Sequence, residues 1–329
     1  MLQLFRSNTL FALISFVLLG ISMRLAGFLG FSEATKQSMS PLAQWLFKWM
    51  SLNAPMAWQS ALVAGLLLII QAFFINYIAA SQQILYKESV MPGLFFIFLC
   101  SLYPNQLELT PQLIANTFLI LLVYRLCYLY EAPKPIFPVL DAGMMLGLGL
   151  LFDFDLIIYL PFILLSVLYM ASFNLRHLLV ALLGMALPVY FLAAILFLND
   201  SQGKLLELWQ YTIDKSFLKP IGITWEKSFI WFLLLPILVV SLVQFQLNFF
   251  RNKVKTRRVQ LMIGIMLPFG IISIFAGDYG FELGLSYLAI PFSFILANFY
   301  VRTSWKWFKE ISFLLFLFGL IYYQYLMSV

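Results

Sequence analysis

The sequence of 329 residues predicts an all-α fold, a polytopic bundle of transmembrane helices that forms a single integral membrane domain over residues 1–329. Of these residues 63% are hydrophobic and only 10% are charged, whereas soluble proteins carry roughly 25% charged residues. Apolar runs of about 20 residues, the length that an α-helix needs to cross a bilayer, recur along the whole chain. The strict polar and apolar alternation of a membrane β-barrel is absent from the sequence.

We expect eleven such helices. They are 8–30, 58–80, 89–104, 110–129, 138–152, 155–172, 178–198, 228–249, 259–277, 283–300 and 311–327. The segments 89–104 and 138–152 are short, because at 1.5 Å per residue each reaches about 23 Å of the roughly 30 Å hydrocarbon core. Such spans are usually buried among neighbours. The first run lacks a small-residue cleavage site, so we expect a retained helix.

The basic residues predict the orientation. With the N-terminus in the cytoplasm, the loop RNKVKTRR (251–258) and most other Lys and Arg side chains fall on the cytoplasmic side, as the positive-inside rule requires. We therefore expect a bacterial inner-membrane protein with a cytoplasmic N-terminus and a periplasmic C-terminus. The same rule accounts for the net charge of +6, which leaves no argument for nucleic acid as a partner.

Two outer loops, 31–57 and 199–227, carry patterns of interfacial helices. In PLAQWLFKWMSLNAPMAW (41–58) the apolar residues recur at helical spacing, which predicts an amphipathic helix lying in the membrane interface; they are Leu42, Trp45, Leu46, Trp49 and Met50. The second loop repeats this pattern more weakly with Leu205, Trp209 and Ile213.

Acidic residues gather on the outer side of this topology: Glu33, Glu108, Asp153, Asp155, Asp200, Glu207, Asp214, Glu226, Asp278 and Glu282. Acidic residues set topology only weakly, so their gathering is additional information. It suggests an acidic outer face. The alternative is that hairpin turns simply need polar residues.

Asp153 and Asp155 occupy the turn FDFD between two predicted spans, which places them at the outer surface. The spacing matches the Asp-x-Asp pattern that holds a divalent cation in many sugar-nucleotide enzymes. A hard cation would need further oxygen ligands, for which the candidates are Glu33, Glu108, Asp278 and Glu282. A polar hairpin turn explains the same residues without a cation. The single histidine and the two cysteines offer no metal-ligand spacing, so a divalent cation is the one cofactor considered.

Arg24 lies within the first apolar run. A charge inside a span is costly, and such residues usually face a cavity or a partner. Near the helix end the side chain could instead extend to the outer interface. If it faces inward, a phosphate headgroup or Glu33 is its natural partner.

Asp141 begins another span, where a carboxylate complements the helix dipole. No second intramembrane ionisable residue is placed at its depth, which argues against a proton relay. Gly143, Gly147 and Gly149 follow it and predict close helix packing.

Two landmarks, LDAGMMLGLGLLFDFDLIIYLP and FNLRHLLVALLGMALPVYF (173–191), resemble an uncharacterised family of multi-pass membrane proteins from Bacteroidetes. That resemblance brings no assigned activity. The layout of a first span, a long outer loop and closely spaced hairpins is also similar to the GT-C class of membrane glycosyltransferases. The class implies a polyprenyl-phosphate-linked sugar as substrate and an outer-loop carboxylate as base or metal ligand. Glu33 is the one acidic residue in the first outer loop, where the class places an Asp or an acidic pair.

The resulting hypothesis is a protein of cell-envelope biogenesis, either a GT-C-like glycosyltransferase or a protein that binds a lipid-linked substrate. Arg24 would bind the lipid phosphate, with Glu33, Asp153 and Asp155 as catalytic candidates. Asp153 and Asp155 are also the candidate metal ligands, and Glu108, Asp278 and Glu282 would form an outer rim.

Two alternatives stay open. A non-catalytic subunit of an envelope or secretion assembly predicts other membrane proteins as partners and tolerance of carboxylate substitutions. A secondary transporter normally shows inverted repeats and polar residues at mid-membrane, for which Gln71, Asn76 and Asn116 are too few. Hydrolase, ATPase and zinc-protease motifs are absent from the sequence.

Overall fold

The computed structural model describes residues 5, 9–28, 40–49, 57–171, 174–200, 203, 225–276, 280–303 and 306–328. Within these residues all regular secondary structure is helical, which confirms the predicted all-α class. The α-helices are α2 Leu10–Ser22, α3 Leu25–Phe28, α4 Pro41–Trp49, α5 Ala57–Ser81, α6 Met91–Leu99, α7 Pro111–Leu129, α8 Ile136–Phe152, α9 Leu160–Met170, α10 Leu175–Leu198, α12 Trp225–Leu247, α13 Val254–Ala276, α14 Gly280–Arg302 and α15 Lys306–Ser328. Three 3-10 helices are η1 Pro104–Gln106, η2 Phe154–Tyr159 and η3 Phe249–Arg251.

A described helix lies within each of the eleven predicted segments. Five helices are long and apolar enough to cross a membrane: Trp58–Ser81, Pro111–Leu129, Leu175–Leu198, Val254–Phe275 and Glu282–Arg302. Other apolar helices, such as Leu10–Ser22 and Ile136–Phe152, are shorter. The helices therefore support a membrane protein, while the count of eleven spans and the orientation stay predictions.

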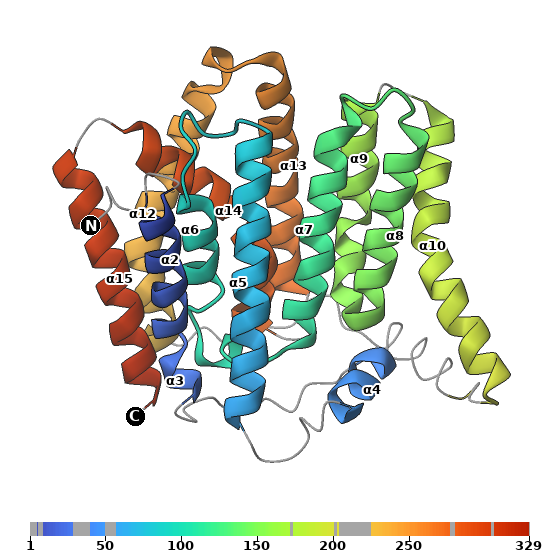
Figure 1. Ribbon diagram of the computed structural model, residues 1–329, viewed down its shortest axis with the longest axis horizontal. Coiled ribbons are helices and arrows are strands. Elements are labelled where there is room, and N and C mark those ends of the chain that lie inside the picture. The colour runs from blue at the N-terminus through green and yellow to red at the C-terminus, as the bar shows by residue number, and fades with distance from the viewer. Residues whose placement is uncertain are drawn as a thin grey trace.

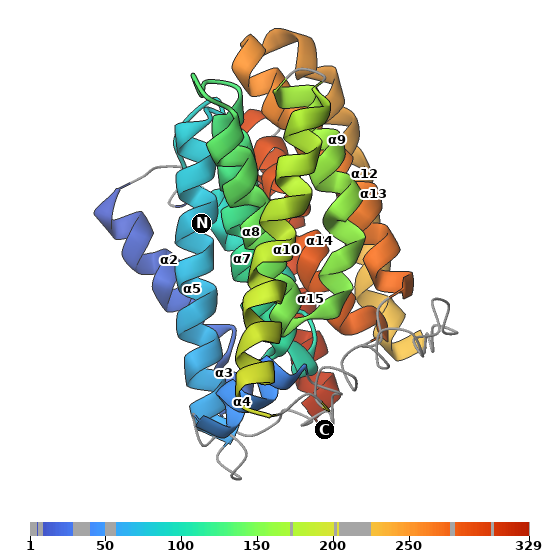
Figure 2. The same cartoon turned by 90° about the vertical axis from the view of Figure 1, so that its right-hand side faces the viewer.

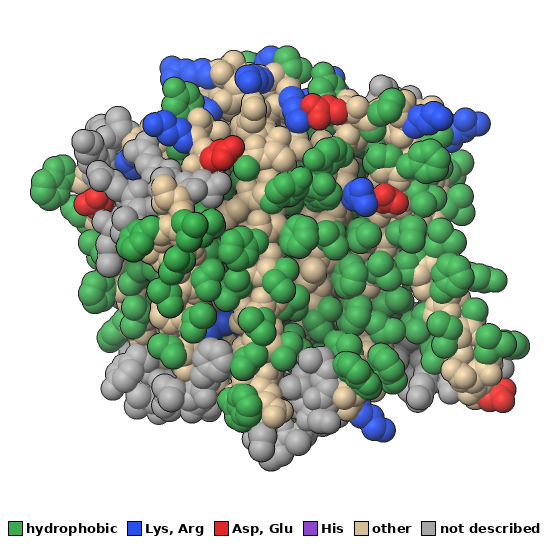
Figure 3. Space-filling view, in the orientation of Figure 1, with side chains coloured by type: hydrophobic (Ala, Val, Ile, Leu, Met, Phe, Trp, Pro, Cys, Tyr) green, Lys and Arg blue, Asp and Glu red, His purple; other side chains and the backbone are tan. Residues whose placement is uncertain are grey.

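The bundle has two chemically different ends (Figure 1). We call the end with the loops 82–90, 130–135 and 248–253 the basic end, since most Lys and Arg side chains visible in Figure 3 gather there. Apolar side chains cover the middle of the same face. The opposite end holds η1, η2 and α4, which lies at an angle to the other helices.

The helix at the centre of the bundle is α14. Of its apolar stretch within Glu282–Arg302, 94% is buried inside the protein. It packs against α6, α7, α12 and α13. Polar side chains in apolar helices form hydrogen bonds to neighbouring helices. Asn76 of α5 accepts one from the Gly93 amide at 2.7 Å, and Asn116 of α7 donates one to the Ser286 carbonyl at 2.8 Å. These are contacts of the kind that hold membrane helices together.

Glycines bring α8 and α10 into backbone contact, and the two helices run side by side in Figure 2. A Cβ atom on Gly143 would lie 2.3 Å from the Ala181 carbonyl oxygen, and one on Gly147 would lie 2.4 Å from that of Met185. Gly149 instead faces the Leu156 side chain at 2.5 Å. The predicted close packing is confirmed.

Replacing Gly147 with valine should destabilise the protein by about 2 kcal/mol, because the new side chain meets backbone that cannot rotate away. The control is Gly264→Val, since a Cβ atom on Gly264 of α13 meets nothing within 4 Å. Thermal unfolding of both variants in detergent would check this. Equal midpoints for the two variants would refute the packing argument.

Asp141 has a partner that the sequence argument missed. Arg125 of α7 lies 3.5 Å from its carboxylate, and the two side chains are 45% and 37% exposed. The expectation that no second ionisable residue lies at the depth of Asp141 is therefore wrong. The two charges meet because α7 and α8 pack side by side.

The predicted interfacial helix corresponds to α4, and the face that packs against the protein does not include its tryptophans. Ala43 and Phe47 are buried, whereas Trp45 and Trp49 are 64% and 72% exposed. Ser40 caps the helix and donates hydrogen bonds to the carbonyls of Leu151 and Phe152 at 2.7 and 2.9 Å. This fixes α4 beside the end of α8. Its place in a membrane interface stays a prediction, and Leu205, Trp209 and Ile213 of the second loop lie outside the described residues.

Candidate functional site

Arg24 lies at the break between α2 and α3, and its side chain points into the protein with 1% exposure. The expected alternative of a side chain that extends to the interface is therefore wrong. Its Nη1 donates to the Leu107 carbonyl at 3.0 Å, and Nη2 donates to those of Gln106 at 2.9 Å and Cys100 at 3.5 Å. These acceptors are neutral, so among the described residues the positive charge is solvated by carbonyl dipoles and not by a carboxylate.

The acceptors of Arg24 belong to the turn around η1, which other helices also hold. Gln106 donates to the Glu282 carbonyl at 2.6 Å, and Asn105 donates to the Glu282 carboxylate at 2.6 Å. Gln324 of α15 donates to the carbonyls of Ser101 at 2.6 Å and Met23 at 3.1 Å. Arg24 and Glu282 thus meet at one turn, and half-buried Glu108 follows in the same segment.

Asp153 and Asp155 are buried at 1% and 4% exposure, rather than at the surface as the sequence predicts. Asp153 ends α8 and begins η2, and its Oδ1 accepts a hydrogen bond from the Asp155 amide at 3.1 Å. Its Oδ2 accepts a short hydrogen bond from the Tyr287 hydroxyl of α14. The burial arises because η2 packs against α13 and α8 instead of projecting from the bundle.

The first turns of α14 connect these groups. Glu282 binds the η1 turn and Tyr287, five residues later, binds Asp153. The sequence did not single out Tyr287 or Gln324, since nothing in an apolar run marks which polar residue faces a distant partner. We call this group, consisting of Arg24, Asn105, Gln106, Asp153, Asp155, Glu282 and Tyr287, the opposite-end polar cluster.

Two predicted site residues, Glu33 and Asp278, lie outside the described residues. The described residues on either side of Glu33 contact chain neighbours of the cluster. A Cβ atom on Gly27 would lie 3.0 Å from Cβ of Leu107, and Ser40 binds the carbonyls that precede Asp153.

A divalent cation at Asp153 and Asp155 stays a prediction. Among the described residues no group of three or more His, Cys, Asp or Glu side chains could hold a metal ion. Both oxygens of Asp153 already accept hydrogen bonds from protein donors. A hard cation needs about six oxygen ligands, so it would need ligands beyond Asp153 and Asp155.

Comparison with known proteins gives a family and a fold. Residues 42–329 match a family of unknown function, DUF6427. No curated protein sequence matches the chain. Among solved structures, the oligosaccharyltransferase from Archaeoglobus fulgidus in its apo form has a similar fold, with a TM-score of 0.53 and 9% identity over 97% of this chain and 56% of that one.

A second structure from Archaeoglobus fulgidus, the archaeal oligosaccharyltransferase AglB in complex with an inhibitory peptide and a dolichol-phosphate, matches with a TM-score of 0.44 and 10% identity over 94% of this chain and 51% of that one. The chain thus spans about half the length of the proteins it matches. The fold similarity to the apo enzyme supports the GT-C-like layout expected from the sequence.

Proposed function

The chain belongs to the DUF6427 family, and we propose that it is a GT-C-like membrane protein of cell-envelope biogenesis that takes a polyprenyl-phosphate-linked sugar from the bilayer. The observation that carries this proposal is the oligosaccharyltransferase-like fold over 97% of the chain. The opposite-end polar cluster is the candidate binding and catalytic site. Fold alone does not imply function, so the residues of the cluster carry the rest of the argument.

Arg24 is the candidate for binding the lipid phosphate. Within the described residues its partners are carbonyl groups, and its Nε has no hydrogen-bond partner. A buried guanidinium keeps its charge and in a low-dielectric interior attracts an anion strongly. A phosphate oxygen at Nε would satisfy the buried donor and supply the missing negative charge.

The carboxylates are the candidates for proton transfer. In the proposed reaction an acceptor hydroxyl attacks the anomeric carbon, the bond to the phosphate oxygen breaks, and a carboxylate takes the hydroxyl proton. Asp153 accepts hydrogen bonds from two protein donors, and Glu33 and Asp155 are the other base candidates. Glu108, Asp278 and Glu282 would form the rim. Since Asp155 is buried, entry of a substrate requires the surrounding segments to move.

Native mass spectrometry of the gently extracted chain tests the proposal. We expect a polyprenyl phosphate to bind at least tenfold more tightly than the same polyprenol without its phosphate, because the phosphate recruits the Arg24 charge. This comparison uses the wild-type protein, so it does not depend on whether a variant folds. Equal affinities, together with a stoichiometric protein partner in the extracted material, would replace this proposal with that of a non-catalytic subunit.

A further inference from the structure

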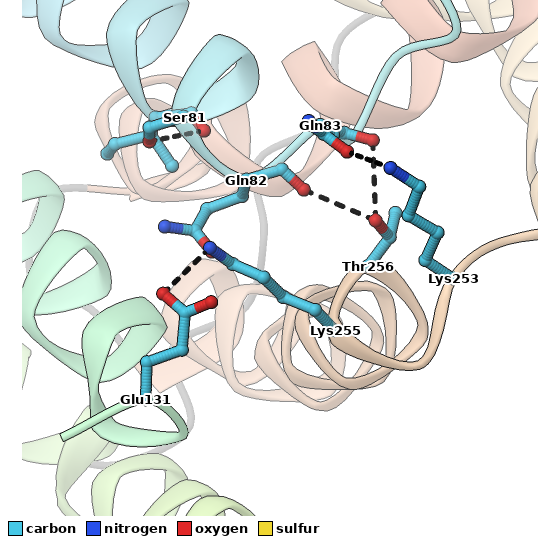
Figure 4. A network of polar contacts seen from close by, with 8 residues as sticks. Ser81, Gln82, Gln83, Glu131, Lys253, Lys255 and Thr256 are labelled. Carbon is cyan, nitrogen blue, oxygen red and sulfur yellow. Dashed lines mark hydrogen bonds and ion pairs between the residues drawn. The ribbon is translucent and has the colours of Figure 1, made fainter. Parts of the chain in front are cut away.

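A cavity of about 460 Å³ lies at the basic end, away from the opposite-end polar cluster. Its walls come from the loop between α5 and α6, from η3 and the start of α13, and from the end of α14. Figure 4 shows how two of these walls are joined: Thr256 donates to the Gln82 carbonyl at 3.3 Å, and Lys253 donates to the Gln83 side chain at 2.9 Å. The volume falls in the range of small-ligand sites.

The cavity is strongly basic. Lys87, Arg251, Lys253 and Arg302 line it, against the single carboxylate of Glu88. Within the described residues none of the four cations forms an ion pair. Lys253 and Arg302 donate to the neutral side chains of Gln83 and Asn252 instead. Four cations around one cavity repel each other, and an anion between them relieves that repulsion.

Two buried donors in this cavity also lack acceptors. The Arg302 Nε and the Asn252 Nδ2 atoms are buried and have no hydrogen-bond partner among the described residues. Buried N–H groups are normally paired. Both residues line the cavity, so a ligand there that carries acceptor oxygens would bring acceptors close to these two donors.

Arg302 also lines a second hollow, an apolar groove of about 510 Å³ between α12, α14 and α15. Its walls include Val239, Val243 and Leu247 of α12, Phe299 of α14 and Phe308 of α15. The three α12 side chains are 54%, 55% and 72% exposed. One arginine therefore stands between a basic cavity and an apolar groove on the outside of the bundle.

We propose that this end of the protein binds an anionic phospholipid, with its phosphate in the basic cavity between Arg302 and Arg251 and one acyl chain in the groove along α12. A free phosphate would use the cavity without the groove, and a neutral lipid would use the groove without the cavity. Only an anionic amphiphile fits both hollows at once. This site is separate from the proposed function, because Arg24 and the carboxylates lie at the other end.

A general excess of basic residues at a cytoplasmic end is the competing explanation. It predicts that any cation at this end contributes equally to lipid binding. The proposal instead predicts that the cavity residues matter and that other cations at the same end do not. Arg176 of α10 provides the comparison, since it is exposed and lines neither hollow.

The test is native mass spectrometry of the delipidated full chain titrated with dioleoyl phosphatidylglycerol, and separately with dioleoyl phosphatidylcholine. We expect at least a tenfold preference for phosphatidylglycerol, reduced about tenfold by Arg302→Gln and by Lys253→Gln, since each removes a charge-assisted contact. Arg176→Gln should change the affinity less than twofold. Using two cavity variants guards against a folding defect in one of them.

Groove variants separate the lipid from a free phosphate. Val243→Trp fills the groove and should weaken phosphatidylglycerol binding about tenfold, whereas Leu183→Trp, at a 62% exposed position on α10, should not. Inorganic phosphate at millimolar concentration should not displace the lipid. Equal affinity for both lipids, equal effects of Arg302→Gln and Arg176→Gln, or displacement by phosphate with no effect of Val243→Trp would each overturn the proposal.

Discussion

Replacing Arg24 with methionine is expected to destabilise the folded protein by about 3 kcal/mol. Methionine fills a similar volume but donates no hydrogen bonds. The carbonyls of Cys100, Gln106 and Leu107 would lose their donor. Each buried acceptor left unpaired costs about 1 kcal/mol or more. Chemical or thermal unfolding in detergent measures the loss.

Arg125→Met is the matched control. Arg125 is 45% exposed and makes one ion pair with Asp141 at 3.5 Å, and exposed pairs of this kind contribute less than about 1 kcal/mol. Arg24→Lys is expected to fall between the two, because an ammonium group keeps the charge and some of the donors but not the planar fork. If Arg24→Met were as stable as Arg125→Met, the guanidinium would not be holding the η1 turn.

The helices could be predicted from the sequence because a bilayer imposes a simple requirement of length and apolarity. Every predicted segment contains a described helix. The close approach of α8 and α10 also followed from Gly143 and Gly147, since only small residues let two helix backbones touch. These features depend on residues close together in the sequence.

The contacts between helices that are distant in the sequence could not be predicted in the same way. A helix that is apolar all round has no polar stripe to mark its outer face, so the sequence did not show that α14 would lie at the centre of the bundle against α6, α7, α12 and α13. For the same reason the burial of the FDFD turn and the Arg125–Asp141 pair were missed.

In the candidate site, too, some features could be predicted from the sequence and others could not. Arg24 could be found from the sequence because a charge within a span is costly and needs a reason. Its acceptors could not, because they are carbonyl groups more than 70 residues away in the chain, and every residue has such a group. Tyr287 was missed because an apolar span tolerates tyrosine, and only the packing of η2 near α14 reveals its bond to Asp153.

The two carboxylates of the FDFD turn should therefore respond differently to substitution. Asp155→Asn is expected to lower the rate of sugar transfer from a polyprenyl-phosphate donor by about 100-fold, the lower limit of what a general base contributes. Asp153→Asn should mainly lower stability, because its oxygens accept from the Asp155 amide and the Tyr287 hydroxyl. Transfer rates per folded molecule and unfolding midpoints distinguish the two effects.

Tyr287→Phe completes this comparison, because it removes the donor to Asp153 without touching Asp155. A structural Asp153 predicts that Tyr287→Phe and Asp153→Asn are non-additive in stability, as for any two residues that share one hydrogen bond. A catalytic Asp153 predicts instead that Asp153→Asn abolishes transfer in a protein that remains stable. If Asp155→Asn and Glu33→Gln both left transfer intact, neither carboxylate could be the base, and the cluster would serve only to hold α8 and the η1 turn to α14.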